Sequence, residues 1–243
     1  MLYLIGTQHN DLKLEQRLET ALDALKPDVI LVEGDAKRIA IQARKRRALL
    51  REFTGRLLRK GYAKREIPGI FRTFGYRQAV EPRVAFAYAE RNRVSAYHLE
   101  KSPNPRALAE QTIAFERQRI IDVPPRALAA VLRPEFFASE AEFQRTVDRG
   151  YIDFAREYAS KRSKARVALL DAHAPTIVGE RDRLMERTVR DKIRGTTVAI
   201  AGAIHLYQDE QGRTLYERVK DLRPLRTLAS DFSQGINRAT AST

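Results

Sequence analysis

The sequence predicts an α/β protein: a mostly parallel sheet with flanking helices and a long helical insertion between core strands. Two observations support this fold class. Residues 29–32 form a continuous apolar run, which is typical of a strand covered on both faces. Before that run, leucines recur at helical spacing, and before them comes a second apolar run at residues 2–5. Residues 2–33 therefore read as a strand, a crossover helix and a parallel strand.

The crossover helix has recognisable ends. Asn10 or Asp11 can cap its start, and Pro27 marks its end. Its apolar face comprises Leu14, Leu18, Leu22 and Leu25.

The remaining elements follow from the same patterns. Helices are expected at 35–60, 84–92, 104–120, 125–133, 138–174, 175–194 and 214–222, and further strands at 94–99, 196–201 and, as an edge strand, 225–230. Residues 233–243 read as a frayed tail. We interpret residues 1–243 as one domain, with its core in 1–38, 80–100 and 175–230, a basic helical segment at 37–79 and a helical insertion at 104–174.

Composition excludes several classes of protein. The chain has no cysteine, which rules out a disulfide framework, a thiolate zinc site and a cysteine nucleophile. Its start lacks the charge and apolar length of a signal peptide, and no stretch approaches the roughly 20 apolar residues of a membrane span. We expect a soluble cytoplasmic protein, and a homo-oligomer remains an open alternative.

The charge of the chain is strongly positive and unevenly distributed. The formal net charge is +14, and residues 37–65 contain twelve Lys or Arg but a single acid, Glu52. Such a segment favours contact with a polyanion such as nucleic acid. The alternative is the solvated face of a long helix, whose Arg and Lys stems also cover apolar surface.

Two of the four histidines share one local pattern. Gly6-Thr7-Gln8-His9 follows the first predicted strand, and Gly202-Ala203-Ile204-His205 follows the strand at 196–201. Glu33 ends the strand at 29–32. Because ligands bind outside the carboxyl ends of parallel strands, we expect these side chains to gather at one edge of the sheet.

Two helices should begin at the same edge, because a helix that leads into a parallel strand runs in the opposite direction. One would bring Glu180, Arg181 and Asp182 to the edge, and the other Glu81 and Arg83. Each carboxylate could equally serve only to complement a helix N-terminus.

Two imidazoles with one or more carboxylates suit a divalent transition metal. Such a metal lowers the pKa of bound water and polarises a carbonyl group, while a nearby arginine can hold a carboxylate or an oxyanion. The other two histidines are less suggestive. His98 follows an apolar run and reads as structural, and His173 reads as a helix-end residue.

Four segments resemble the TraB/PrgY family, which belongs with the Tiki metalloproteases and is distantly similar to erythromycin esterases and ChaN proteins. They are GTQH after the first strand, VEGDAKR after the second, GERD before the last core strand and GAIH after it. The stretch AVEPRVAFAYAERNRVSAYHLEK resembles the Glu-containing helix and following strand of the family. The sequence departs from the pattern in two places: Gly34 replaces a leucine, and His98 and Glu100 stand where the family usually has an Asp-Arg pair.

The resemblance implies a metal-dependent hydrolase, peptidase-like in the Tiki branch. On this reading His9, His205 and Glu33 are metal ligands, with Mn, Co or Zn as the metal. Glu33 could instead be the general base, Glu180 would be a second catalytic carboxylate, and Arg181 or Arg38 the anion clamp. The other matched positions are Gly6, Thr7, Asp35, Glu81, Asp182 and Gly202.

The expected substrate is a peptide or a small amide or ester. Two alternatives remain open. One is a non-catalytic protein that binds a peptide or signal in the same pocket, and the other is a polyanion-binding protein that uses residues 37–65.

Overall fold

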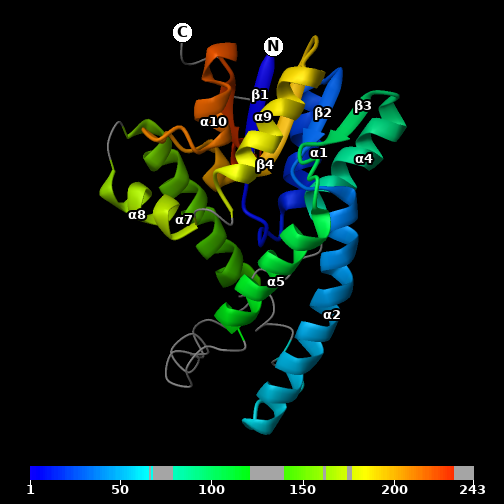
Figure 1. The fold of residues 1–243 in the computed structure, drawn as a ribbon, viewed down its shortest axis with the longest axis vertical. Helices are drawn as coiled ribbons and strands as arrows, with labels where there is room; N and C mark the ends of the chain where they lie inside the picture. Colours follow the sequence, from blue (N-terminus) through cyan, green and yellow to red (C-terminus); the bar gives the residue numbers. More distant parts are fainter. Residues whose placement is uncertain (66, 68–78, 121–139, 161–162, 174–176, 233–243) are drawn as a thin grey trace.

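A computed structural model describes residues 1–65, 67, 79–120, 140–160, 163–173 and 177–232 (Figure 1). Its centre is a five-stranded sheet in which every pairing is parallel, with the order β3-β2-β4-β1-β5. The strands are β1 (Leu2–Thr7), β2 (Val29–Val32), β3 (Ser95–His98), β4 (Thr197–Gly202) and β5 (Leu225–Leu228). The predicted α/β class is confirmed.

The sheet places β4 between the two strands of the predicted N-terminal unit. Leu2 of β1 and Val29 of β2 both pair with Thr197, so β1 and β2 are parallel but are not neighbours. Both β2 and β4 are buried along their whole length, as their apolar sequences require. β5 lies at one edge of the sheet, as predicted for residues 225–230.

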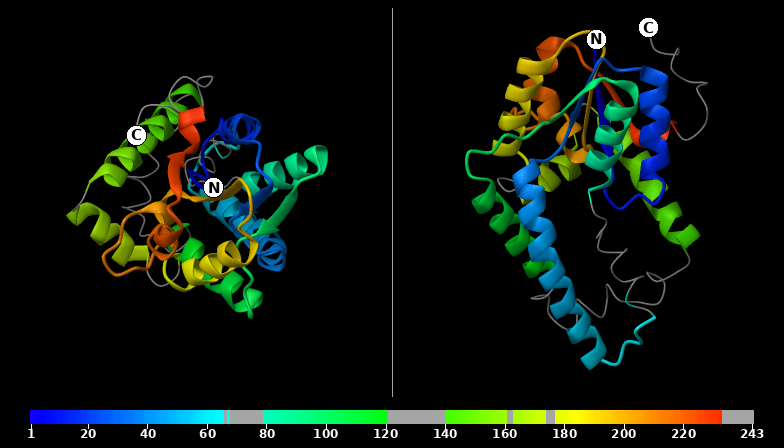
Figure 2. Two further views of the ribbon diagram at one scale, coloured as in Figure 1. Left: turned by 90° about the horizontal axis from the view of Figure 1, so that it is seen from above. Right: turned by 90° about the vertical axis from the view of Figure 1, so that its right-hand side faces the viewer.

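Helices cover both faces of the sheet (Figure 2). On one face, α1 (Leu14–Leu25) packs against α4 (Val80–Asn92). On the other face, α9 (Glu180–Lys192) packs against the short helix α10 (Leu215–Arg218). The predicted cap of the first helix is wrong in detail, because Lys13 is the N-cap residue while the Asp11 side chain accepts a hydrogen bond from the Lys13 N–H.

Two long helices extend from the carboxyl edge of the sheet and lie side by side (Figure 1). They are α2 (Ala36–Arg59) and α5 (Pro105–Ile120). Across from them lie α7 (Glu140–Ala159) and α8 (Lys164–His173), so the helical stretch predicted at 138–174 is two helices. Three short 3₁₀ helices complete the described part: η2 (Ala203–Leu206), η3 (Lys220–Leu222) and η4 (Ala229–Phe232).

Some predicted elements lie outside the described residues, and one helix begins at a different residue. The helix predicted at 125–133, most of 66–78 and the tail at 233–243 lie outside the described residues. The helix predicted from residue 175 begins at Glu180 instead. Among the described helices, none is long and apolar enough to cross a bilayer.

Candidate functional site

The carboxyl ends of three adjacent strands bring together the side chains that follow them. Glu33 follows β2, His9 lies two residues beyond β1, and His205 lies in η2 directly after β4. His9 Nε2 is 4.0 Å from one Glu33 carboxylate oxygen, and His205 Nε2 is 3.6 Å from the other. The expected grouping of both Gly-x-x-His motifs with Glu33 is therefore observed in the fold.

The Nδ1 atom of each histidine contacts a second carboxylate. His9 Nδ1 lies 2.5 Å from a Glu81 oxygen, and His205 Nδ1 lies 2.8 Å from an Asp182 oxygen. Glu81 stands in the first turn of α4 and Asp182 in the first turn of α9, so both helix N-termini reach the edge as expected. With Nδ1 occupied in this way, the Nε2 atom of each ring faces Glu33.

The two supporting carboxylates are themselves fixed by hydrogen bonds. The Thr7 hydroxyl donates to Glu81 over 3.0 Å. Backbone N–H groups of Leu215 and Gly179 donate to Asp182 over 2.6 and 3.0 Å. Asp182 is completely buried, so these donors replace the water that would otherwise solvate its charge.

Each carboxylate oxygen of Glu33 accepts a hydrogen bond. The Gly202 N–H donates to one oxygen over 2.6 Å, and the Arg181 guanidinium donates to the other over 2.5 Å. Gly202 has to be small here, because a Cβ atom would stand 3.2 Å from His9 Nε2 and 3.3 Å from Glu33. The glycine of the second motif therefore lets both groups approach the end of β4.

Arg181 continues into a buried ion pair network. It donates to Glu100 from two nitrogens, over 2.6 and 3.2 Å, and Arg38 donates to the same carboxylate over 2.9 Å. Glu100 is completely buried. We call the whole group the charged cluster; its members are His9, Glu33, Arg38, Glu81, Glu100, Arg181, Asp182 and His205.

The network shifts the titration of the histidines and of Glu33. The Glu81 carboxylate raises the pKa of His9 to about 9. Burial opposes the charge on His205, but Asp182 and Glu33 outweigh it and raise that pKa to about 10. For Glu33, burial is likewise outweighed, here by His205 and Arg181, so its pKa lies well below the usual range.

The two histidines differ in their access to solvent. The His205 side chain is 1% exposed, whereas the His9 side chain is 55% exposed. Glu33, between them, is 10% exposed. A ligand from solvent therefore meets His9 first, and His205 forms the buried wall of the site.

Several expected positions lie outside the charged cluster. Glu180 turns away, is exposed, and forms an ion pair with Arg183, so its expected catalytic role is not supported by its placement. Arg83 pairs with Glu15 on the surface. Asp35 caps α2 by accepting from the Arg38 N–H.

Gly6 lies within β1, where a Cβ atom would stand 2.8 Å from the Tyr158 hydroxyl, so this glycine serves packing. His98 packs on Phe86 with a ring-centroid distance of 4.8 Å. His173 Nδ1 donates to the Leu169 carbonyl over 2.8 Å within α8, and the residue is partly exposed. Both observations agree with the structural roles expected for these two histidines.

Glu100 is the member of the cluster that sequence reasoning did not assign. It was visible only as a departure from the Asp-Arg pair of the TraB/PrgY pattern. In the fold its backbone N–H bonds to the Gly34 carbonyl, which brings it beside the end of β2. A carboxylate directly after the strand predicted at 94–99 was the available signal.

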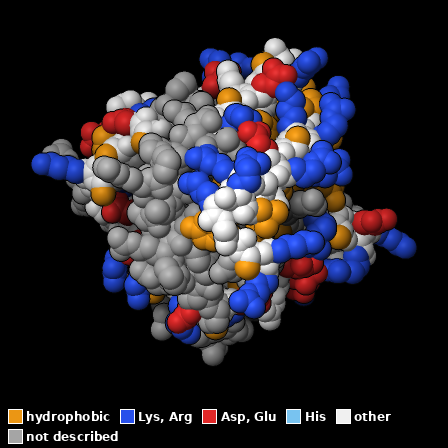
Figure 3. Space-filling view, turned by 90° about the horizontal axis from the view of Figure 1, so that it is seen from below, with side chains coloured by type: hydrophobic (Ala, Val, Ile, Leu, Met, Phe, Trp, Pro, Cys, Tyr) orange, Lys and Arg blue, Asp and Glu red, His pale blue; other side chains and the backbone are white. Residues whose placement is uncertain are grey.

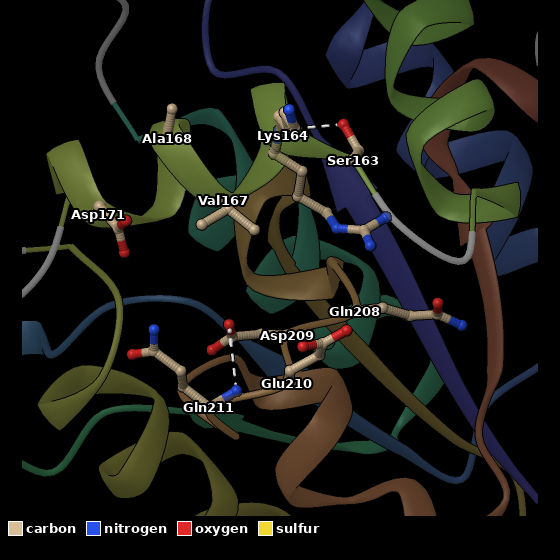
Figure 4. Close-up of a pocket in the computed structure, with 10 residues that line it drawn as sticks. Ser163, Lys164, Val167, Ala168, Asp171, Gln208, Asp209, Glu210 and Gln211 are labelled. Atoms are coloured by element: carbon tan, nitrogen blue, oxygen red, sulfur yellow. Dashed lines mark hydrogen bonds between the residues drawn. The ribbon is translucent and has the colours of Figure 1, made fainter.

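A separate groove of about 640 Å³ lies between α8 and residues 208–211 (Figure 4). Its lining includes Lys164, Val167, Asp171 and Gln208, and none of its lining residues belongs to the charged cluster. The chemistry of the site is defined by the cluster and not by this groove.

The site contains the types of ligand that bind divalent metals in proteins. They are two imidazole Nε2 atoms and one carboxylate, and each imidazole Nδ1 contacts a second carboxylate. Within the described residues, however, no three His, Asp or Glu side chains already surround one point at ligand distance. Glu33 would have to exchange its contact with Arg181 or with the Gly202 N–H to serve as a ligand.

No family model, curated protein or solved structure matches this chain. The assignment of a class of protein consequently depends on the geometry of the charged cluster, with the TraB/PrgY resemblance as an expectation.

Proposed function

We propose that this chain is a metal-dependent hydrolase whose metal ligands are His9, His205 and Glu33. One observation carries the proposal: both histidines use Nδ1 to bind a supporting carboxylate and turn Nε2 toward the same third carboxylate. Histidines that ligate metals in proteins are oriented in this way, because the supporting carboxylate fixes the tautomer and raises the basicity of the other nitrogen.

The net charge of the charged cluster favours the binding of a cation. Its four carboxylates face two guanidinium groups, which leaves two negative charges in excess when both imidazoles are neutral. In the absence of metal, two imidazolium ions supply the balance. One divalent cation would supply it equally and leave both Nε2 atoms free to bind.

The residues of the site would divide the work as follows. A bound metal supplies a polarised carbonyl group and a water of lowered pKa. Glu33 suits the role of ligand better than that of general base, because its low pKa makes it a weak proton acceptor. Arg181 would position Glu33, because its Nε and one terminal nitrogen donate to Glu100 and Glu33.

The choice of bond to be hydrolysed depends on the resemblance to TraB/PrgY and Tiki proteins. It favours a peptide or small amide, with an ester as a related substrate. The exposed side of His9 is where such a carbonyl group would approach, since His205 is enclosed.

The first test is the metal content of the purified protein and its variants after dialysis against Mn, Co or Zn. Near-stoichiometric metal in the wild type, lost in both His9→Ala and His205→Ala, is the expected result. Glu180→Ala is the matched control, because Glu180 lies on the same helix end but is exposed and forms an ion pair with Arg183. Metal retained in both histidine variants would overturn the assignment.

Hydrolysis follows as the second readout, with a fluorogenic peptide library as the probe. Activity that follows metal content across the same variants supports the hydrolase. A protein that binds peptides but shows neither metal nor turnover would instead be the non-catalytic binding protein. Polyanion binding through residues 37–65 is a further candidate function.

A further inference from the structure

The long helix α2 divides its basic residues between two faces. On the inner face, against α5, Lys45 forms an ion pair with Glu110 and Arg46 with Glu116. The only acid of α2, Glu52, accepts from Arg117 of α5 over 2.7 Å. The inner basic residues are thus explained by packing between the two helices.

Within the described part of the chain, the outer face of α2 has no such partners. Its basic residues are exposed, and none forms an ion pair with a described residue. We call this set the basic stripe: Lys37, Arg44, Arg47, Arg51 and Arg59. Because Glu52 is already bound by Arg117, α2 offers the stripe no carboxylate of its own.

The stripe destabilises the helix that carries it. Arg44, Arg47 and Arg51 are spaced by three and four residues, and like charges at such spacings cost about 0.2–0.5 kcal/mol per pair. On other helices, some exposed arginines have carboxylate partners, as Arg190 has in Glu186 and Asp221. Contacts among the described residues give no reason for the positive charge of these exposed arginines.

The shape of α2 suits an elongated polyanion. Its 24 residues correspond to about 36 Å of helix, and the helix extends away from the sheet (Figure 1). Seen from below, Lys and Arg side chains clearly outnumber Asp and Glu on the described surface (Figure 3). Duplex DNA presents a phosphate charge about every 1.7 Å along its axis, so one duplex could engage the whole stripe.

A membrane surface is a poorer match. Helices that lie on membranes insert an apolar face between the lipids. The apolar face of α2 is occupied, because Leu49, Phe53 and Leu57 are buried. An acidic lipid surface could then contact the stripe through charge alone.

We propose that the basic stripe of α2 binds the phosphate backbone of nucleic acid without sequence preference. The stripe shares no residue with the charged cluster. A test of nucleic acid binding therefore has an outcome that is independent of the hydrolase proposal.

The test is fluorescence anisotropy with a labelled DNA duplex over a range of salt concentrations. The affinity of the wild type should fall steeply with salt, with a slope near −0.9 for each phosphate neutralised. The variant Arg44→Gln/Arg47→Gln/Arg51→Gln should bind at least about tenfold more weakly, and its salt slope should be smaller by about three. The substituted side chains are exposed and repel one another, so the urea midpoint of the variant should equal or slightly exceed that of the wild type.

A charge-matched control removes three exposed basic residues from other elements: Lys13→Gln/Arg149→Gln/Arg187→Gln. This control should retain the affinity and slope of the wild type within about threefold. Equal losses in the two variants would show that net charge alone drives binding and would overturn the proposal. Flat salt dependence, or binding to phosphatidylserine vesicles with none to DNA, would overturn it as well.

Discussion

Asp182→Asn isolates the contribution of one buried carboxylate to the charged cluster. An asparagine oxygen can still accept from His205 Nδ1 and from the Leu215 N–H. Its amide nitrogen, however, would replace the oxygen that accepts from the Gly179 N–H over 3.0 Å, so two donors would face each other. We expect this conflict to lower the free energy of unfolding by about 1–3 kcal/mol near neutral pH.

The substitution should also change the pH dependence of stability. His205 has a pKa of about 10 in the folded chain, above its ordinary value of 6.5. Its protonated form therefore stabilises the fold fully below pH 6.5, and this contribution is lost as the pH rises through about 10. In metal-free wild type, linkage predicts a loss of about 3 kcal/mol from His205 between about pH 6 and about pH 9.

Without the Asp182 carboxylate, the pKa of His205 falls and this loss should shrink by at least about 1 kcal/mol. The assay is urea unfolding at the two pH values with a chelator present, for both proteins. His9 and other groups titrate alike in both, so the comparison reports His205. An identical loss of stability in the two proteins would refute the assignment of Asp182 as the support of His205.

Three further substitutions test other contacts of the site. Gly202 has an ordinary backbone conformation (φ −54°), but the Cβ atom of Gly202→Ala would press on His9 and Glu33. The metal affinity measured by calorimetric titration should therefore fall about tenfold, while the urea midpoint is retained. An unchanged affinity would argue against a metal at these side chains. Glu100→Gln leaves the buried Arg38 guanidinium without its carboxylate partner and removes one of the two carboxylates that bind Arg181. It should cost about 3–5 kcal/mol by urea unfolding, against less than about 0.5 kcal/mol for the exposed Glu180→Gln. Gly6→Ala should lower stability by about 1–3 kcal/mol, because the added Cβ meets the Tyr158 hydroxyl at 2.8 Å; a higher melting temperature would contradict this.

The side chains that meet at the carboxyl edge of the sheet were predictable, because the residues that directly follow parallel strands lie there. Once the strands are parallel, whatever follows β1, β2 and β4 lies at one end, and this placed His9, Glu33 and His205 together without knowledge of any contact. The Gly-x-x-His pattern added the second constraint, since Gly202 admits two side chains above the strand end.

Which side chain of a helix faces the site was harder to predict. Glu180, Arg181 and Asp182 are consecutive, and successive residues of a helix point about 100° apart. Arg181 and Asp182 turn inward and Glu180 outward, a phase set by the packing of Leu184 and Met185 rather than by the motif itself. The first turn of α9 therefore reached the site with its second and third residues, not with the first.

Glu100 was missed for a related reason. Its role arises from Arg38 and Arg181, which come from two helices far apart in sequence, and only their convergence makes a buried carboxylate necessary. A local pattern carries no information about that convergence.

The central position of β4 has a consequence for how the chain folds during synthesis. β1 and β2 emerge early, yet each pairs with β4, which emerges more than 160 residues after β2 begins. Until then, the open edges of both strands lack their native partner. Topologies dominated by such distant pairings fold slowly, and unpaired edges are prone to aggregation. We expect the nascent chain to depend on chaperones until β4 is made, whatever its mature activity.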